Sequence, residues 1–481
     1  MIFNNQMSEK QFFYKEICEW LSSRKRGLML KAEAYLDGHH DIEQTKRMVI
    51  GENGELTEIK NLPNNHVVDN QFERMVSQKT NYLFSNELVI KTEDPEYHKL
   101  LVLYFNRLFH LKMQTLGLEA ILGGIAYIYV YYDQAGELDF DVFMPYEGIP
   151  YWSDSIHTKM SHFVRVFNVQ AYEGNQKVGI TKAEVFKEDG IHRYTLVKDN
   201  MIADFDNPMS SYIVQHDEES DQDVSYNWER FPVIAFKYNA REIPLLQKVK
   251  SLQDGINTML SAFQNGMDED VHKTILVLVN YDGQNLGEFR KNLATYGAVK
   301  VRSSDGVQGD VKTLQVEVNN ENYQAIIRIF KQALIENAHG YDAKDDRLSG
   351  SPNEMNLRSM YSDLDLDANG METQFQASLE QLLWFINQDL INKGKGDYRN
   401  EKVQFVFNRD IMVNVGENIA NCRNSMGLVS NKTILANHPF VTNVDDELEA
   451  VKQEKLQNME DFGLPARGQE IDSTQEEDED E

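Results

Sequence analysis

The chain has 481 residues, 26% of them charged, and its 77 acidic and 48 basic side chains give a formal net charge of −29. This length suits about three domains and excludes a disulfide-stapled miniprotein or a wholly disordered chain. The charge argues against a protein that wraps nucleic acid with its whole surface, because duplex affinity comes largely from cations that replace condensed counterions. Any contact with DNA must therefore be local or weak.

The two cysteines, Cys18 and Cys422, lie far apart, so neither a metal knuckle nor a disulfide framework is predicted, and the chain fits a reducing cytoplasm. The first residues lack a basic stretch followed by an apolar one. The longest uncharged apolar run, residues 120–132, is shorter than the ~20 residues that span a bilayer. We expect neither a standard secretion signal nor a membrane-embedded chain.

Residues 12–107 show a mostly helical pattern. One helix face is predicted from apolar steps of three and four at Phe72, Met75, Val76, Lys79 and Leu83. Between about residues 125 and 238 the apolar period changes to two, with turn signals at 133–136 and 188–190. We predict a helical scaffold followed by an antiparallel β region.

Pro244 opens the next element, because proline suits the first turn of a helix. The helix to about residue 270 carries an apolar seam with alternating spacings of four and three: Leu245, Val249, Leu252, Ile256, Met259 and Phe263. A seam this narrow favours packing against neighbouring helices, whereas a helix on its own domain core usually shows a broader face. An ordinary helix within the domain remains an equal alternative.

Residues 271–315 follow as a short β-type island, with predicted strands at 275–279 and 298–301. Six basic and four acidic residues give this stretch a net charge of +2 in an acidic chain, although local charge fluctuates by such amounts anyway. Asn319 or Asn320 then caps a second helix that runs to about His339. Two helices around an island imply a hairpin-like excursion.

Residues 341–353 form a polar loop with Gly350 and Pro352, and a long helix follows that ends at 393–396. Its apolar face is Phe375, Leu379, Leu382, Ile386 and Leu390. A strand at 403–407 and helical pieces from about 417 to 457 complete the folded part. Residues 470–481 contain eight acids and no base, so we expect this tail to be disordered.

Asp365-x-Asp367-x-Asn369-Gly370 matches the opening of a calcium-binding EF-hand loop. Position twelve is Gln376, where the loop needs a bidentate Glu. We therefore favour the polar face and start of the helix that carries Phe375. A calcium-regulated adaptor is the weaker alternative.

Three carboxylates, Asp342, Asp345 and Asp346, could hold two magnesium ions, and a metal-dependent DNA-processing enzyme is therefore an alternative. Nucleases usually place such acids on neighbouring strands, whereas these crowd one loop. Walker, GxGxxG, GxSxG and HExxH motifs do not occur, and His39-His40-Asp41 is interpreted as solvated surface. We predict no enzyme, no cofactor and no metal.

The segment GLVSNKTILANHPFV at 427–441, followed by DDELE at 445–449, resembles portal proteins of tailed double-stranded-DNA bacteriophages of the long-tailed siphophage type. Residues 35–42, 70–83 and 249–255 resemble other segments of that family in the same order. The resemblance covers roughly residues 30–460. Residues 85–87 and 352–354 depart from the family pattern. The resemblance therefore does not define the turn at the first site or the loop boundary at the second.

The resemblance implies an α+β portal fold in a ring of about twelve subunits at one capsid vertex, through which the genome enters and leaves. In this chain it maps the wing to 1–240, the first stem helix to 241–270, the clip to 271–318, and the second stem helix to 319–340. The tunnel loop and a long wing helix would be 341–392, the crown 393–460, and the acidic tail 461–481.

The resemblance also implies roles for the basic residues and for the seam. A channel that repels phosphate over most of its wall would hold DNA only at sparse cations. Our candidates for these cations are Lys248, Lys250, Lys344 and Arg347, and those for partner docking on the clip are Arg290, Lys291, Lys300 and Arg302. The seam from Leu245 to Phe263 would join neighbouring subunits, since a heterologous interface closes when its rotation divides the circle.

The partners implied by the resemblance are the terminase large subunit, a head-completion or adaptor protein, the scaffold and major capsid proteins, and DNA of any sequence. The protein would assemble in the host cytoplasm and reside in the virion. The energy for packaging would come from the terminase, because this chain has no phosphate-binding loop of its own.

Overall fold

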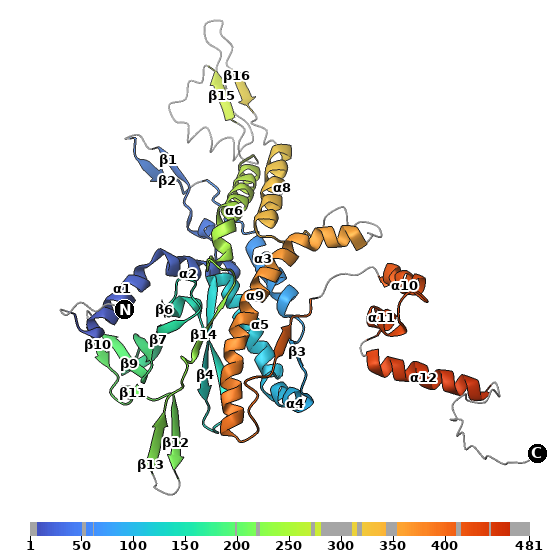
Figure 1. Ribbon diagram of the computed structural model, residues 1–481. Helices are drawn as coiled ribbons and strands as arrows, with labels where there is room; N and C mark the ends of the chain where they lie inside the picture. The colour runs from blue at the N-terminus through green and yellow to red at the C-terminus, as the bar shows by residue number, and fades with distance from the viewer. Residues whose placement is uncertain are drawn as a thin grey trace, which may run out of the picture. The chain divides into compact units, whose positions relative to one another are not determined.

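The computed structural model describes residues 7–50, 54–60, 62–197, 200–217, 222–270, 275–279, 310–314, 320–342, 354–409, 415–441 and 444–461. The chain divides into two units, each described by itself. The first combines Met1–Tyr341 with Asp363–Asp410, and the second combines Asp342–Ser362 with Ile411–Glu481. The predicted mixture of helices and sheets is confirmed (Figure 1).

The first unit begins with α1 (Glu9–Ser22) and α2 (Arg24–Leu36), followed by the 3₁₀ helix η1 (Asp41–Gln44). Ser8 and Gln11 form a capping box at the start of α1, and Ser23 ends α1 and caps α2. The hairpin of β1 (Met48–Ile50) and β2 (Leu56–Glu58) comes next.

Asn70 caps α3 (Gln71–Phe84), because its side chain accepts a hydrogen bond from the backbone of Glu73. All five residues of the predicted apolar stripe on this helix are buried, so that prediction is confirmed. Helices α4 (Pro95–Tyr104) and α5 (Arg107–Gly123) follow.

The antiparallel β region is also confirmed. A three-stranded sheet has the order β14–β4–β5, formed by Val233–Lys237, Ile125–Tyr132 and Leu138–Phe143. The 3₁₀ helix η2 (Pro145–Glu147) leads into a larger sheet of order β10–β9–β8–β7–β6, with β11 beside β9. Its strands are β6 (Gly148–Trp152), β7 (Met160–Glu173), β8 (Gln176–Lys187), β9 (Gly190–Val197), β10 (Asn200–Ala203) and β11 (Met209–Ser210).

Three further strand pairs are antiparallel hairpins or long-range pairs. They are β12 (Ile213–Asp217) with β13 (Gln222–Tyr226), β15 (Ile275–Val279) with β16 (Asp310–Leu314), and β3 (Val89–Thr92) with β17 (Val403–Val406). The predicted strand at 275–279 is present, and the one at 298–301 lies outside the described residues.

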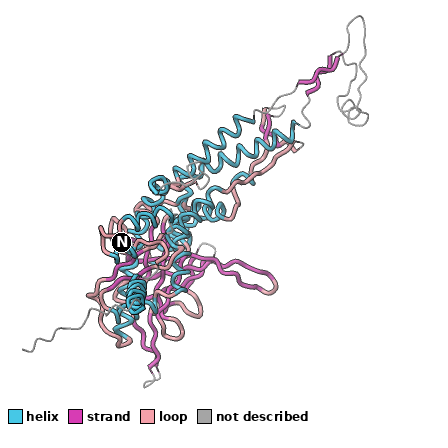
Figure 2. The backbone as a smooth tube through the Cα atoms, turned by 90° about the vertical axis from the view of Figure 1, so that its right-hand side faces the viewer, coloured by secondary structure: helices cyan, strands magenta, loops and turns pink. Residues whose placement is uncertain are grey.

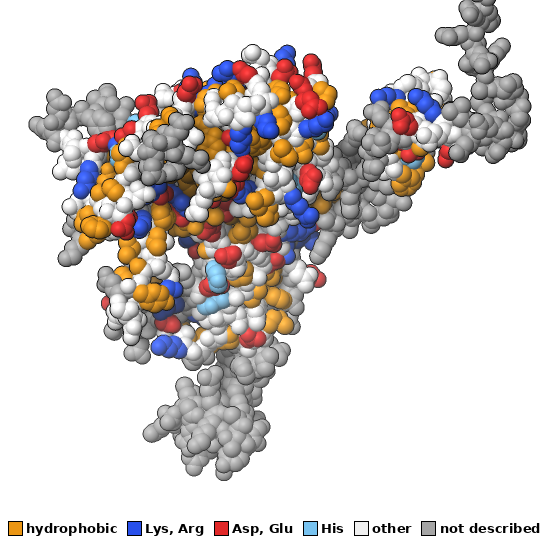
Figure 3. Space-filling view, turned by 90° about the horizontal axis from the view of Figure 1, so that it is seen from below, with side chains coloured by type: hydrophobic (Ala, Val, Ile, Leu, Met, Phe, Trp, Pro, Cys, Tyr) orange, Lys and Arg blue, Asp and Glu red, His pale blue; other side chains and the backbone are white. Residues whose placement is uncertain are grey.

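Aromatic and aliphatic side chains fill the space under the two sheets. Phe13 and Ile17 of α1 pack on Val164 and Val185 of the larger sheet. Between the sheets the rings of Phe143, Phe163 and Phe186 contact one another and Tyr129. On the face seen in Figure 3, acidic and basic side chains are interspersed over the described surface.

Three long helices complete the first unit: α6 (Leu245–Asp270), α8 (Asn320–Asn337) and most of α9 (Glu354–Asn392). The predicted bounds of the first two helices are confirmed to within a few residues. The start of α9 differs, because the helix already includes residues 365–370. These residues lie on the helix that carries Phe375, as the favoured interpretation expected, but in its interior and not at its start. The EF-hand loop predicted there is wrong.

The second unit contains α10 (Val415–Asn424), α11 (Asn431–Ala436) and α12 (Val444–Asp461). Ser430 caps α11, and the buried thiol of Cys422 faces the carbonyls of Ile434 and Asn437. The range mapped to the crown is divided between the units, because β17 pairs with β3 in the first unit. The tail at 470–481 lies outside the described residues. No helix within the described ranges is both long and apolar enough to cross a bilayer.

Candidate functional site: the helix pair and its anchors

Helices α6 and α8 lie side by side and rise from the sheets in opposite chain directions (Figures 1 and 2). Gly255 lets them approach closely, because a Cβ atom there would lie 2.9 Å from the ring of Phe330. Further along, the rings of Phe263 and Tyr323 have centroids 5.5 Å apart. Each helix therefore has a close partner within the same chain.

The six residues of the predicted seam divide into two groups. Leu245, Val249 and Ile256 are fully buried within the single chain, so they support the first unit's own packing. Leu252, Met259 and Phe263 are only half-buried. A role between subunits stays a prediction for these three residues.

A second stripe on α6 is polar and buried, which the sequence reasoning missed. Gln253, Asn257 and Ser261 are at most 4% exposed and stand four residues apart. They face the extended segment 65–69 and the start of α3, whose backbone N–H groups donate to them. The bonds are Asn65 N to Asn265 Oδ1 (2.7 Å), Val67 N to Ser261 Oγ (2.9 Å), Asp69 N to Asn257 Oδ1 (3.1 Å) and Phe72 N to Gln253 Oε1 (2.9 Å).

This ladder works because two periodicities match. Four residues of helix rise about 6.0 Å, and two residues of extended chain advance about 6.6 Å. The amides of residues 65, 67 and 69 therefore meet the side chains of residues 265, 261 and 257 in turn. The bond from Phe72 to Gln253 lies three residues further on, at the start of α3. Asp69 also binds α8, since its Oδ2 lies 2.5 Å from Nζ of Lys331. The segment before α3 thus fixes both helices of the pair.

His40 belongs to the same anchor, so its predicted place on the solvated surface is wrong. It is 2% exposed and stacks on Tyr35 with ring centroids 4.1 Å apart. Asn257 Nδ2 donates to its Nδ1 at 2.8 Å, and its Nε2 donates to the Tyr35 carbonyl at 3.2 Å. Burial lowers the pKa of His40, which favours the neutral ring that these two bonds require.

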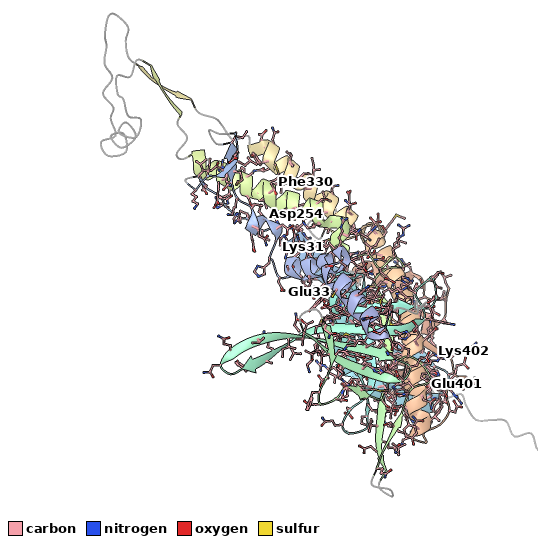
Figure 4. All side chains as sticks on the ribbon, turned by 90° about the vertical axis from the view of Figure 1, so that its left-hand side faces the viewer. Lys31, Glu33, Asp254, Phe330, Glu401 and Lys402 are labelled. Atoms are coloured by element: carbon pink, nitrogen blue, oxygen red, sulfur yellow. The ribbon has the colours of Figure 1, made fainter. Side chains whose placement is uncertain are left out.

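Lys250, predicted to contact DNA, has two carboxylate partners in its own chain. Its Nζ lies 2.7 Å from Asp41 Oδ2 and 2.5 Å from Asp254 Oδ2. Lys31 also pairs with Asp41, and Tyr35 donates to Asp254 at 2.6 Å. Figure 4 shows Lys31 on α2 and Asp254 on α6. Although partial burial opposes it, the bonds from Lys250 and Lys31 lower the pKa of Asp41 to about 2.

Lys248, the second predicted DNA contact on α6, lies at the edge of a buried charge network. Asp367 accepts from Lys79 Nζ at 2.6 Å and from the Tyr238 hydroxyl at 2.7 Å, and Lys248 Nζ lies 4.0 Å away. Asp365 is bound by Tyr82 and Arg409. The acids of the EF-hand-like sequence therefore form ion pairs with Lys79 of α3 and with Arg409, and Asp367 also accepts a hydrogen bond from Tyr238 just after β14.

The remaining predicted site residues lie outside the described residues. They are Lys344 and Arg347 of the loop, Arg290, Lys291, Lys300 and Arg302 of the island, and the acids Asp345 and Asp346. Across the part of the chain that the structure describes, no group of three His, Cys, Asp or Glu residues is placed to hold a metal ion.

Comparison with known proteins adds the family context. A family profile described as "Phage portal protein, SPP1 Gp6-like" matches residues 19–461. The portal protein of Bacillus phage SPP1 is 26% identical over 443 residues, covering 90% of this chain and 84% of that protein. The portal protein of Clostridium phage phiCD119 is 25% identical over 443 residues, covering 90% and 93%.

The solved structures matched include chains from gene transfer agent (GTA) particles. A chain in the neck of an empty GTA particle shares 13% identity with a TM-score of 0.40, covering 82% of this chain and 89% of that chain. A chain in the virion of a native GTA particle shares 14% identity with a TM-score of 0.39, covering 76% and 89%.

Proposed function

The chain belongs to the SPP1 Gp6-like family of phage portal proteins, and on that premise we propose that it forms a ring of about twelve copies at one capsid vertex. The match over residues 19–461 carries this proposal. Members of this family are structural components of phages and not enzymes. The ring would therefore provide a passage for DNA and a docking surface for proteins, and it would not catalyse a reaction.

In this proposal α6 and α8 form the stem of the ring. Their close packing at Gly255 and the ladder to residues 65–72 make each subunit's pair stiff before assembly. Leu252, Met259 and Phe263, which the single chain leaves half-buried, would contact the next copy. A heterologous contact of this kind repeats until the ring closes.

Double-stranded DNA would pass through the ring without sequence preference, because phosphate contacts carry no sequence information. The net charge of −29 disfavours tight binding of DNA. The ion pairs of Lys250 with Asp41 and Asp254 reduce the electrostatic attraction between this lysine and DNA phosphates. The other candidates for phosphate contact are Lys344, Arg347 and Lys248, whose Nζ lies 4.0 Å from Asp367. We expect weak and salt-sensitive association with DNA.

The partner proteins of this proposal bind in sequence. The terminase large subunit would dock on residues 271–318 during packaging, with Arg290, Lys291, Lys300 and Arg302 as candidate contacts. A head-completion or adaptor protein would later occupy the same surface, and scaffold and major capsid proteins would surround the ring in the capsid. The protein would then reside in the virion after assembly in the host cytoplasm.

Negative-stain microscopy of the purified chain, combined with mass measurement, tests the proposal. We expect annular particles whose mass corresponds to about a dozen chains. Phage particles assembled without the protein should remain empty of DNA. Material that stays monomeric at high concentration, together with normally filled particles in its absence, would overturn the proposal.

A further inference from the structure

Glu119 of α5 is a buried carboxylate with an unsatisfied oxygen. The residue is 7% exposed, and its Oε2 has no hydrogen-bond partner among the described residues. A buried ionised carboxylate without a partner is strongly unfavourable, so a group in this position lowers its cost by binding a proton.

Close packing surrounds Glu119 on α5. Leu116 and Ala120, on either side of it in α5, are fully buried. A Cβ atom at Gly117 would lie 2.2 Å from the Phe84 ring, and one at Gly123 would lie 2.2 Å from Pro145 of η2. Only glycine permits contacts this close, so α5 cannot shift to expose the carboxylate without breaking this packing.

The charged groups that face Glu119 are mostly acidic. Glu33 of α2 and Glu147 of η2 repel its charge, and Asp37 just after α2 adds to the charge around Glu33. The nearby guanidinium groups bind elsewhere. Arg165 of β7 pairs with Glu147 at 2.9 Å, and Arg26 Nε of α2 donates to the Tyr146 carbonyl at 3.1 Å. Figure 4 shows Glu33 on α2, nearer the sheets than Lys31.

We propose that Glu119, buried where α2, α5 and η2 pack together and without a partner for its Oε2 in the described part of the chain, is a proton-binding group of this junction, with Glu33 of α2 as its second carboxyl. The protonated form keeps the three elements closely packed, and loss of the proton loosens the junction. The reaction requires only water as proton donor and acceptor. The carboxyl O–H bond forms on protonation, and the proton returns to water on release. The pair is thus a pH-sensitive joint within the first unit.

The direction of the pKa values agrees with the geometry. Burial, followed by repulsion from Glu33 and Glu147, raises the pKa of Glu119 to about 7. Burial, followed by repulsion from Asp37 and Glu147, raises the pKa of Glu33 to about 7. Between their ordinary value of 4.5 and about 7 the folded chain binds more protons than the unfolded chain, so its stability falls as the pH rises through this window.

Chemical denaturation of the full-length protein at about pH 5.5 and pH 8.5 tests the proposal. In the native chain the unfolding equilibrium constant should rise roughly thirtyfold at the higher pH through Glu119 alone. Glu119→Gln should remove most of that rise, and it should be the more stable protein at the higher pH. Glu96→Gln, at an exposed position of α4, should keep the native pH dependence.

Trp20 provides a readout of the junction itself, because its Nε1 donates to the Tyr146 carbonyl of η2 at 3.0 Å. Its fluorescence, isolated by comparison with Trp20→Phe, should change between the two pH values in the native chain and stay constant in Glu119→Gln. If Glu119→Gln does not fold, Glu33→Gln serves with the same expectation. An unchanged pH dependence of stability in a folded variant would overturn the proposal, whether or not the protein forms rings.

Discussion

The Nδ1 atom of His157 lies 2.6 Å from Oε1 of Glu242, and both residues have positive φ angles, 58° and 55°. Such backbone costs roughly 1–3 kcal/mol at each non-glycine residue, and it persists where the surroundings fix it. Here Glu242 is 7% exposed and also contacts Lys25 at 3.2 Å and Lys237 at 3.5 Å. Trp152 stacks on the His157 ring. This cluster fixes the connection between β14 and α6.

The first prediction concerns the charge of Glu242. Glu242→Gln should destabilise the protein by about 3 kcal/mol at neutral pH, because Lys25 and the buried Lys237 lose their shared counter-charge. Chemical denaturation measures this loss. Glu96→Gln breaks an exposed pair with Lys99 and should change stability little. An equal effect of the two substitutions would contradict the prediction.

The carboxylate of Glu242 also predicts how the stability of the protein depends on pH in the acidic range. Although burial alone would raise it, His157, Lys25 and Lys237 hold the pKa of Glu242 below its ordinary value of 4.5. A depressed pKa stabilises the folded state above the unfolded value, and this stabilisation is lost as the pH falls. The difference in stability between the native chain and Glu242→Gln should therefore shrink below about pH 4.5.

The ladder of polar side chains on α6 predicts that truncating its members lowers the stability of the protein, whereas truncating a side chain on the exposed face does not. Ser261→Ala and Asn257→Ala should each destabilise the protein by about 1–3 kcal/mol, because they leave the partly buried N–H groups of Val67 and Asp69 without acceptors. Ser251→Ala, on the exposed side of the same helix, is the matched control and should be nearly neutral. Equal denaturation midpoints for all three variants would rule out an energetic role for the ladder.

Two helical glycines should respond in opposite ways to the same substitution. Gly370→Ala in α9 meets nothing within 4 Å and should stabilise the protein by up to about 1 kcal/mol through helix propensity. Gly255→Ala must displace the Phe330 ring and should be destabilising. Thermal unfolding of both variants measures the contrast, and a higher Tm for Gly255→Ala would show that α6 and α8 are less closely packed.

The half-buried seam residues should affect assembly more than folding. Leu252→Glu and Met259→Glu should shift the proposed rings to smaller species at equal protein concentration, while unfolding of the single chain changes little. His98→Glu, at an exposed position of α4, introduces the same negative charge and serves as the control. Mass measurement and negative-stain microscopy provide the readout, and intact rings in both seam variants would contradict the proposed contact.

Features of this arrangement that depend on neighbouring residues could be predicted from the sequence, whereas those that depend on distant residues could not. The bounds of α6 and α8 followed from local signals, Pro244 and the apolar spacing. The buried stripe of Gln253, Asn257 and Ser261 gave no such signal, because its partners are backbone groups almost two hundred residues earlier. Local sequence cannot show that an extended segment will lie along a helix.

His40 and Asp367 show the same limit for charged and polar groups. Each was interpreted from its immediate neighbours, as surface or as part of a calcium-type loop. Their true partners, Asn257 for the first and Lys79 and Tyr238 for the second, come from distant elements. Burial and ion pairing of single polar residues are properties of the packed chain, and the hydrophobic period alone does not encode them.

The matched spacing between α6 and residues 65–72 has a mechanical consequence. Any displacement of the segment along the helix would leave several amides without acceptors at once. A force applied along the axis of α6 is therefore transmitted through residues 65–69 to α3, so that the helix and the segment move together.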